Sequence, residues 1–134
     1  MDIVITEWAL ESYLNLRHED VFSEVEYWTV LRPDVELLKD GFPFKHEQFQ
    51  NPKFWGPAKG KDGKVIQGGY KMKWHNIGNG RVQLRLLVVL QEEKAFLCQA
   101  YVKSSDKKDF REMAKLKIYI HDIVSGRFVM RGLL

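Results

Sequence analysis

The sequence predicts a small α+β domain: an antiparallel sheet with N-terminal helices and a C-terminal helix packed on one face. Segments of strand-like alternation occupy the middle of the chain, and apolar residues at helical spacing lie on either side of them. The chain has 134 residues, enough for one hydrophobic core. We therefore expect residues 1–134 to form a single domain.

The N-terminal half is expected to contain one strand and two helices. Segment 2–6 is short and β-branched, which predicts a strand, and apolar spacing predicts a helix over about 7–18. Ser23 followed by Glu26 is a capping-box signature that opens a second helix. Pro33 should break or restart that helix, because it lacks an amide donor and clashes with the preceding turn. A further short helical piece should follow it.

Residues 42–63 contain three of the four prolines and five aromatic residues. We expect an ordered loop that is held in place because its aromatic side chains pack onto the domain. The alternative is a surface on which nucleic-acid bases stack. The aromatic residues are Phe42, Phe44, Phe49, Phe54 and Trp55.

Three consecutive strands are predicted over residues 65–77, 81–91 and 95–104. The turns between them are predicted to be three residues long, at 78–80 and 92–94. Loop length fixes the register of a hairpin, and a slip of one residue moves every side chain to the other face. This register places Lys73 opposite Arg85, and Arg85 opposite Tyr101.

The predicted register separates an apolar face from a cationic face. The apolar face is predicted to contain Tyr70, Met72, Trp74, Leu84, Leu86, Val88, Phe96, Cys98, Ala100 and Val102. The cationic face is predicted to contain Lys71, Lys73, His75, Gln83, Arg85, Tyr101 and Lys103, with Gln83 between His75 and Lys103.

A final helix should begin at a cap formed by Ser105 or Asp106 and end near Gly126. Its apolar side is predicted to contain Phe110, Met113, Ala114, Lys117, Ile120 and Val124. We expect the remaining tail to add a short edge strand.

Charge is distributed unevenly along the chain. Residues 1–50 carry 4 Lys/Arg and 11 Asp/Glu, a net charge of −7, whereas residues 51–134 carry 17 and 7, a net charge of +10. A basic region of this size suggests a polyanion or an acidic protein as partner. The alternative is that the two halves neutralise each other across the fold.

Several function classes find no support in the sequence. The single cysteine, Cys98, excludes an intramolecular disulfide and favours a reducing compartment. No signal peptide or membrane span is predicted, so we expect a cytoplasmic protein. The four histidines lack metal-ligand spacing, and no phosphate loop or nucleophile elbow is present. We therefore expect no metal and no cofactor.

The cationic face is the candidate for chemistry. Antiparallel sheets often expose one face to water, so a solvated face is the simplest explanation. Cations that face one another across strands without an intervening acid are less expected, because like charges destabilise such pairs. Arginine can bind a phosphate bidentately, and a lysine with a lowered pKa can act as a base. Such a face suits attack by an RNA 2′-hydroxyl on the adjacent phosphorus, with histidine or tyrosine as the acid.

Segment 70–74 (YKMKW), the hairpin sequence 85–109 and the closing amphipathic helix resemble the RelE/HigB/ParE toxin superfamily. The resemblance covers residues 68–125. It implies a RelE-like fold and the toxin of a type II toxin–antitoxin system. The implied activity is metal-independent, ribosome-dependent endoribonuclease cleavage of mRNA, which inhibits translation. The implied partners are mRNA, the ribosome and a cognate antitoxin.

The resemblance also implies roles for individual residues. Lys71 and Lys73 match paired lysines in base and phosphate-binding roles, and Arg85 matches a phosphate-binding arginine. Some members of the family have a tyrosine near the position that Phe110 occupies here. A phenylalanine cannot transfer a proton, so another residue must be the acid. The catalytic candidates are therefore Lys71, Lys73, His75, Arg85, Tyr101 and Lys103, with His75 or Tyr101 as the acid. The RNA-binding candidates are Lys71, Lys73, Arg85, Lys103, Lys107 and Lys108.

Two alternatives from other classes remain open. One is a ParE-like toxin that inhibits DNA gyrase by contact alone, for which the cations serve docking. The other is a non-catalytic nucleic-acid-binding module, whose affinity should fall steeply with salt.

Overall fold

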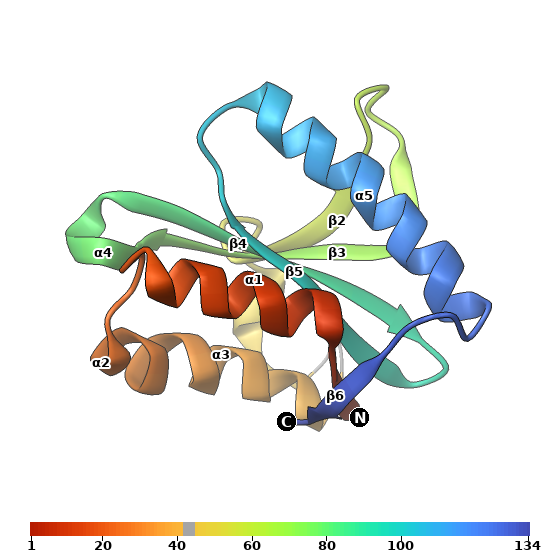
Figure 1. Cartoon of the computed structure of the whole chain (residues 1–134), viewed down its shortest axis with the longest axis horizontal. Helices are drawn as coiled ribbons and strands as arrows, with labels where there is room; N and C mark the ends of the chain where they lie inside the picture. The colour runs from red at the N-terminus through yellow and green to blue at the C-terminus, as the bar shows by residue number, and fades with distance from the viewer. Residues whose placement is uncertain (42–44) are drawn as a thin grey trace.

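The computed structural model describes residues 1–41 and 45–134 and contains one six-stranded sheet with helices on both faces (Figure 1). The α+β class predicted from the sequence is confirmed. The strands are β1 (Asp2–Thr6), β2 (Trp55–Lys59), β3 (Val65–Asn76), β4 (Val82–Gln91), β5 (Lys94–Val102) and β6 (Met130–Leu133). The helices are α1 (Glu7–His18), α2 (Glu24–Glu26), α3 (Arg32–Glu36), the single turn α4 (Ile77–Gly80) and α5 (Asp106–Val124).

The strand order is β2-β3-β4-β5-β1-β6. Neighbouring strands are antiparallel except β1 and β5, which run parallel, so the sheet is mostly rather than wholly antiparallel. The C-terminal tail pairs with β1 and forms the expected edge strand. The two chain ends lie side by side, and the amide of Leu134 donates to the carbonyl of Ile3 (Figure 1).

The second helix is interrupted by a π-helical turn and restarts beside Pro33, and a restart is one of the two outcomes that the sequence predicted. The capping box of Ser23 and Glu26 is confirmed, since each side chain accepts from the backbone amide of the other residue. Helix α2 then passes into a π-helical turn, Tyr27–Leu31, in which the amide of Arg32 donates to the carbonyl of Tyr27. A wider turn relieves the clash between a proline ring and the carbonyl four residues earlier. Pro33 therefore lies in the first turn of α3, where no amide donor is needed, and a 3₁₀ turn (Leu37–Asp40) ends the segment.

Helix α5 covers the opposite sheet face from the N-terminal helices, which corrects the predicted arrangement. The N-terminal helices pack on Met72, Trp74 and Leu86, whereas Met113 and Leu116 of α5 pack on the face that the sequence predicted to be cationic. In Figure 1, α5 lies above the sheet and α1 to α3 lie below it. The prediction failed because both faces of β4 are apolar at its centre, from Leu86 to Val89, so the sheet has two faces to cover.

A glycine permits the close approach of α5 to the sheet. A Cβ built on Gly69 of β3 would lie 2.8 Å from Cδ2 of Leu116, closer than real Cβ atoms approach other atoms. The missing side chain at this position therefore lets the fully buried Leu116 rest directly on the strand.

The β4–β5 hairpin reaches the predicted register by a different route. Its turn has two residues, Glu92 and Glu93, because Gln91 pairs with Lys94. A β-bulge after Leu87 then shifts the register by one residue. Between turn and bulge the side chains are inverted relative to the prediction, so Phe96 and Cys98 belong to the core on the α5 side. The β3–β4 turn also differs, because an isolated bridge between Ile77 and Val82 leaves four residues between them.

The segment predicted as a loop over 42–63 contains regular structure. It includes a 3₁₀ turn, Glu47–Gln50, and strand β2, which forms the sheet edge beside β3. Pro57 is tolerated in β2 because an edge strand needs fewer backbone donors. Packing onto the domain is confirmed for three of the five aromatics, and Phe42 and Phe44 lie outside the described residues. The packed side chains, all buried, are Phe49, Phe54 and Trp55.

Helix α5 has the expected caps but buries a different side. The hydroxyl of Ser105 accepts from the amide of Lys108, and after Ser125 the chain turns through Gly126 with a φ of +71°. The buried side contains Asp109, Glu112, Met113, Leu116 and Ile123. Phe110, Ala114, Lys117 and Val124, which the sequence placed on the apolar side, are exposed. The sequence prediction missed the buried side of α5 because two acidic residues, Asp109 and Glu112, interrupt its apolar pattern.

Candidate functional site

Three side chains predicted to face one another form a row across the sheet. Lys73 of β3 pairs with Arg85 of β4, and Arg85 pairs with Tyr101 of β5. The predicted register is therefore confirmed at these positions. The row lies where the N-terminal turn of α5 meets the sheet, since Asp109 of α5 contacts Tyr101.

Asp109 introduces an acid that the sequence prediction did not place on this face. One carboxylate oxygen of Asp109 lies 2.7 Å from the ammonium of Lys71, and the other accepts from the hydroxyl of Tyr101 at 2.5 Å. Burial alone would raise the pKa of Asp109. The hydrogen bonds from Lys71 and Tyr101 outweigh this effect and hold the pKa below its usual value. Lys71 is therefore an ion-paired residue that fixes α5 to β3, and the face has fewer unpaired cations than expected.

Arg85 is almost completely buried, with 5% of its surface exposed, yet no carboxylate of the described residues lies within 4.0 Å of it. Its guanidinium donates to the carbonyl of Leu84 at 3.2 Å and to the side-chain oxygen of Gln83 at 3.1 Å. Burial lowers the pKa of Arg85, and the neighbouring Tyr101 and Asp109 offset this effect only in part. Buried charges are normally paired with an opposite charge, so an anion that reached this guanidinium would be bound favourably.

Lys73 is the second cation of this row that has no carboxylate partner in the described part of the chain. Its ammonium donates to the carbonyl of Pro52 at 3.0 Å. Burial lowers the pKa of Lys73, and the nearby charges of Arg85 and Lys71 lower it further. A lysine in these surroundings loses its proton more readily than an exposed lysine.

The remaining catalytic candidates differ in how closely they are held. The Tyr101 hydroxyl is committed to Asp109, and burial followed by this hydrogen bond raises the pKa of Tyr101 far above its usual value. The Nε2 atom of His75 lies 2.5 Å from the carbonyl of Lys53, so the ring contacts the loop before β2. Lys103 is held most loosely, because its ammonium lies 3.9 Å from Asp106.

The two further RNA-binding candidates occupy the first turn of α5. Lys107 is exposed and Lys108 is partly exposed. The structure thus brings Lys71, Lys73, Arg85, Tyr101 and Lys103 to one region of the sheet, directs His75 to a neighbouring loop, and places Lys107 and Lys108 on the helix above.

Asp109 and Glu112 are the polar residues that the sequence reasoning missed. Asp109 precedes Met113 by four residues and Leu116 by seven, which is the spacing of one helix face. That spacing was a usable signal, because it places a carboxylate on the sheet-facing side of α5. Glu112 lies on the same side, 5% exposed, and pairs with Lys115 at 3.2 Å while its second oxygen has no partner among the described residues.

The opposite charges of the two halves do not neutralise each other through direct contacts. Within the described part of the chain, one ion pair joins residues 1–50 to residues 51–134, between Glu7 and Arg131 at 2.7 Å. The other ion pairs there link residues of the same half. Among the described residues, most of the basic side chains of the second half are therefore not paired with acids of the first half.

An apolar cavity of about 180 Å³ lies elsewhere, between the N-terminal helices and the sheet. Leu31, Leu84 and Leu97 line it, with Tyr13, Tyr27 and Arg32 as its polar contributors. No acidic side chain lines this cavity, and none of the row of Lys73, Arg85 and Tyr101 contributes to it. The titratable cluster and the apolar cavity are thus on opposite faces of the sheet.

Among the described residues, no group of three or more His, Cys, Asp or Glu side chains is arranged to hold a metal ion. In the same residues no helix is both long and apolar enough to cross a bilayer. Comparison of the chain with protein-family models, curated proteins and solved structures found no match.

Proposed function

We propose that this protein is a metal-independent endoribonuclease, the toxin of a type II toxin–antitoxin system, and that it cleaves mRNA at the ribosome. Its partners under this proposal are mRNA, the ribosome and an antitoxin that covers the basic face. The observation that carries the proposal is Arg85, a buried guanidinium without a carboxylate partner, next to Lys73 with its lowered pKa.

Arg85 would bind the scissile phosphate. A guanidinium presents five N–H donors in a planar fork that matches two phosphate oxygens. Two groups of this protein occupy part of that fork, the Leu84 carbonyl and the Gln83 side chain. They orient the guanidinium, and they leave donors for an incoming anion. A phosphate would also supply the negative charge that this buried cation lacks.

Lys73 would act as the base, in its neutral form. It takes the proton from the 2′-hydroxyl, the 2′-oxygen forms a bond to phosphorus, and the bond from phosphorus to the 5′-oxygen breaks. The products are a 2′,3′-cyclic phosphate and a 5′-hydroxyl. The leaving 5′-oxygen takes a proton from Lys103, which is the most loosely held of the catalytic candidates. In this scheme Lys71, Asp109 and Tyr101 are positioning residues that fix the helix beside Arg85.

The first test measures translation and RNA integrity together. Wild type, Lys73→Ala and Arg85→Gln are added to a cell-free translation extract, and the mRNA is mapped by primer extension. We expect wild type to stop synthesis and cut mRNA, and both variants to lose at least 100-fold of the cleavage rate. Lys94→Ala and Arg81→Ala are matched controls, because both residues are exposed and lie outside the row. Equal inhibition by wild type and Lys73→Ala would sink the proposal.

A second test separates the base from the charge at position 73. Lys73→Arg keeps the positive charge but cannot accept a proton near neutral pH. We expect Lys73→Arg to bind RNA as wild type does and to lose cleavage. Wild-type cleavage should rise with pH until the lowered pKa of Lys73 is passed, because the neutral amine is the active form. A Lys73→Arg variant with the wild-type pH profile would remove Lys73 from the role of base.

One observation favours a second candidate, a nucleic-acid-binding protein without cleavage. The two predicted acids, Tyr101 and His75, are both engaged by acceptors of this protein. Under this reading Lys73→Ala removes one phosphate contact and lowers the salt dependence of binding slightly. Intact RNA after incubation with wild type and ribosomes, together with salt-sensitive binding, would support this candidate over the enzyme.

A further inference from the structure

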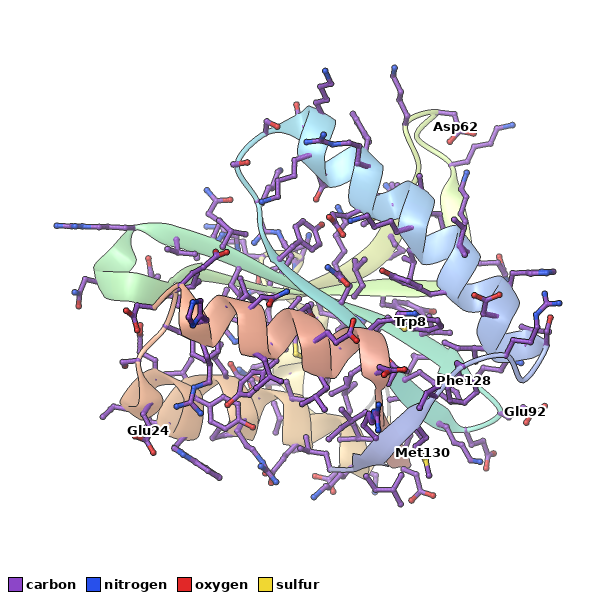
Figure 2. The ribbon with its side chains drawn as sticks, viewed as in Figure 1. Trp8, Glu24, Asp62, Glu92, Phe128 and Met130 are labelled. Atoms are coloured by element: carbon purple, nitrogen blue, oxygen red, sulfur yellow. The ribbon has the colours of Figure 1, made fainter. Side chains whose placement is uncertain are left out.

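A basic hollow lies between the outer side of α5 and the loop that joins β2 to β3. Its volume is about 660 Å³. Figure 2 shows Asp62 at the tip of this loop, which rises beside α5. The lining includes four cations, Lys61, Lys107, Arg111 and Lys117, above Phe110 and Met113.

The four cations of this hollow have no ion-pair partner among the described residues. Every described ion pair involves other lysines, arginines or histidines. The nearest loop acid, Asp62, accepts instead from the amide of Lys64. Single exposed lysines need no explanation. Four cations that line one hollow, with no acid among its lining residues, create a local positive potential. An anionic ligand would relieve it.

The floor of the hollow is apolar. Phe110 is 36% exposed although α5 has a buried side available, and Met113 and Ala114 extend the floor beside it. An exposed aromatic ring bordered by cations is the arrangement that binds single-stranded nucleic acid, because bases stack on the ring while the cations contact phosphates. An acidic peptide would satisfy the cations but would leave the ring without a planar partner.

The hollow adjoins the candidate catalytic row. Asp109 and Phe110 are consecutive residues of α5 that point to different sides, the first to Lys71 and Tyr101 and the second to the hollow. The row and the hollow therefore lie on different sides of the same turn of α5.

We propose that the basic hollow binds the stretch of single-stranded RNA that flanks the phosphate held at Arg85. The inference rests on the proposed function for what then happens to the RNA, but binding is a separate property. The hollow would supply affinity through stacking on Phe110 and through phosphate contacts of Lys107, Arg111 and Lys117. Because stacking tolerates every base, we expect weak sequence preference at this position.

The test uses the full chain and a fluorescent 12-nucleotide RNA in which every 2′-hydroxyl is methylated, so that binding is measured without cleavage. We expect Phe110→Ala to weaken binding about 10-fold, the effect typical of losing one stacked base. The Lys107→Ala/Arg111→Ala/Lys117→Ala variant should bind more weakly still and reduce the salt slope by about 2, at roughly 0.7 for each lost contact. Ile118→Ala and Lys94→Ala are matched controls, because both residues are exposed and outside the hollow.

The outcomes separate this inference from the proposed function. If the hollow variants bind methylated RNA as wild type does, the inference is overturned, even when wild type cleaves unmodified RNA. If wild type cleaves no RNA but the hollow variants lose binding, the inference stands and the proposed function falls. If polyglutamate competes with the RNA at equal charge and Phe110→Ala has no effect, the hollow takes an acidic peptide and the inference is overturned.

Discussion

Asp109 changes the interpretation of the cationic face more than any other residue. It pairs with Lys71 and accepts from Tyr101, so two of the predicted catalytic residues become part of a buried contact between helix and sheet. Lys71 and Tyr101 are therefore assigned a structural role and are not available for the proposed reaction. Lys73 and Arg85 remain without a carboxylate among the described residues, and they carry the proposed reaction.

We expect Asp109→Asn to lower the free energy of unfolding at pH 7 by about 3 kcal/mol, because it leaves the nearly buried Lys71 without its partner. The pKa of Asp109 is lower in the folded than in the unfolded protein. Its stabilising effect is therefore complete above the unfolded pKa of about 3.9 and is lost as the pH falls through the folded pKa. Wild type should lose more stability than Asp109→Asn on acidification below pH 4.

Urea denaturation at a series of pH values measures this difference. Asp106→Asn is the control, since Asp106 lies in the same helical turn but its side chain is 84% exposed. Equal destabilisation by the two substitutions would show that the contact with Lys71 contributes little.

The β4–β5 hairpin keeps the predicted pairing of Arg85 although its turn is one residue shorter than predicted. Glu92 and Glu93 both have positive φ, +50° and +60°, as the favoured two-residue hairpin turn requires. Residues other than glycine and asparagine adopt this conformation at a cost of about 1 kcal/mol each. The bulge after Leu87 then restores the register that aligns Arg85 with Tyr101.

Replacement of the unfavourable turn residue should therefore stabilise the protein. We expect Glu93→Gly to raise the free energy of unfolding by about 1 kcal/mol, because glycine adopts positive φ without steric strain. Glu93→Gln is the matched control, as it removes the charge next to Glu92 but keeps the Cβ. If Glu93→Gln stabilises as much as Glu93→Gly in urea denaturation, repulsion between the carboxylates is the cause and the conformational argument is wrong.

At the scale of the whole molecule, the sheet is shared by two hydrophobic clusters. One includes Leu38, Trp55 and Trp74 on the side of the N-terminal helices, and the other includes Leu116 on the side of α5. Adjacent residues of β4 point into different clusters, so loss of either cluster exposes the same strand. We therefore expect both clusters to unfold in one transition.

Two core substitutions test this expectation. Leu38→Ala and Leu116→Ala each remove a fully buried side chain and should each cost about 2–5 kcal/mol. In a Trp8→Phe background, which removes the tryptophan that stacks on Tyr119 of α5, tryptophan fluorescence reports mainly on the first cluster through Trp55 and Trp74. Far-ultraviolet circular dichroism reports on α5 as well. Both signals should change at the same urea concentration in every variant. Separate transitions in Leu116→Ala would show that α5 unfolds independently of the N-terminal side.

The extent to which the sequence predicted the site follows from the range of the interactions involved. The row of Lys73, Arg85 and Tyr101 was predictable, because alternation along strands and hairpin pairing are local. The partner of Lys73 was not, because Pro52 comes from a separate segment 21 residues away. The partner of Tyr101, Asp109, left a signal only in its spacing along α5, where it shares a face with Met113 and Leu116. The hollow that contains Phe110 was also hidden, since an aromatic residue in an amphipathic helix is normally assigned to the core.

The sequence by itself determined the α+β class, the first strand, the capping box, the three central strands and the C-terminal helix with its caps. Each leaves a periodic or positional pattern within one short segment of the chain. Tertiary structure alone decided that α5 covers the face opposite to α1, that β1 runs parallel to β5, and that a π-helical turn precedes Pro33. These features depend on which buried surfaces meet, and β4 is apolar on both faces, so its pattern does not specify which helix covers which side.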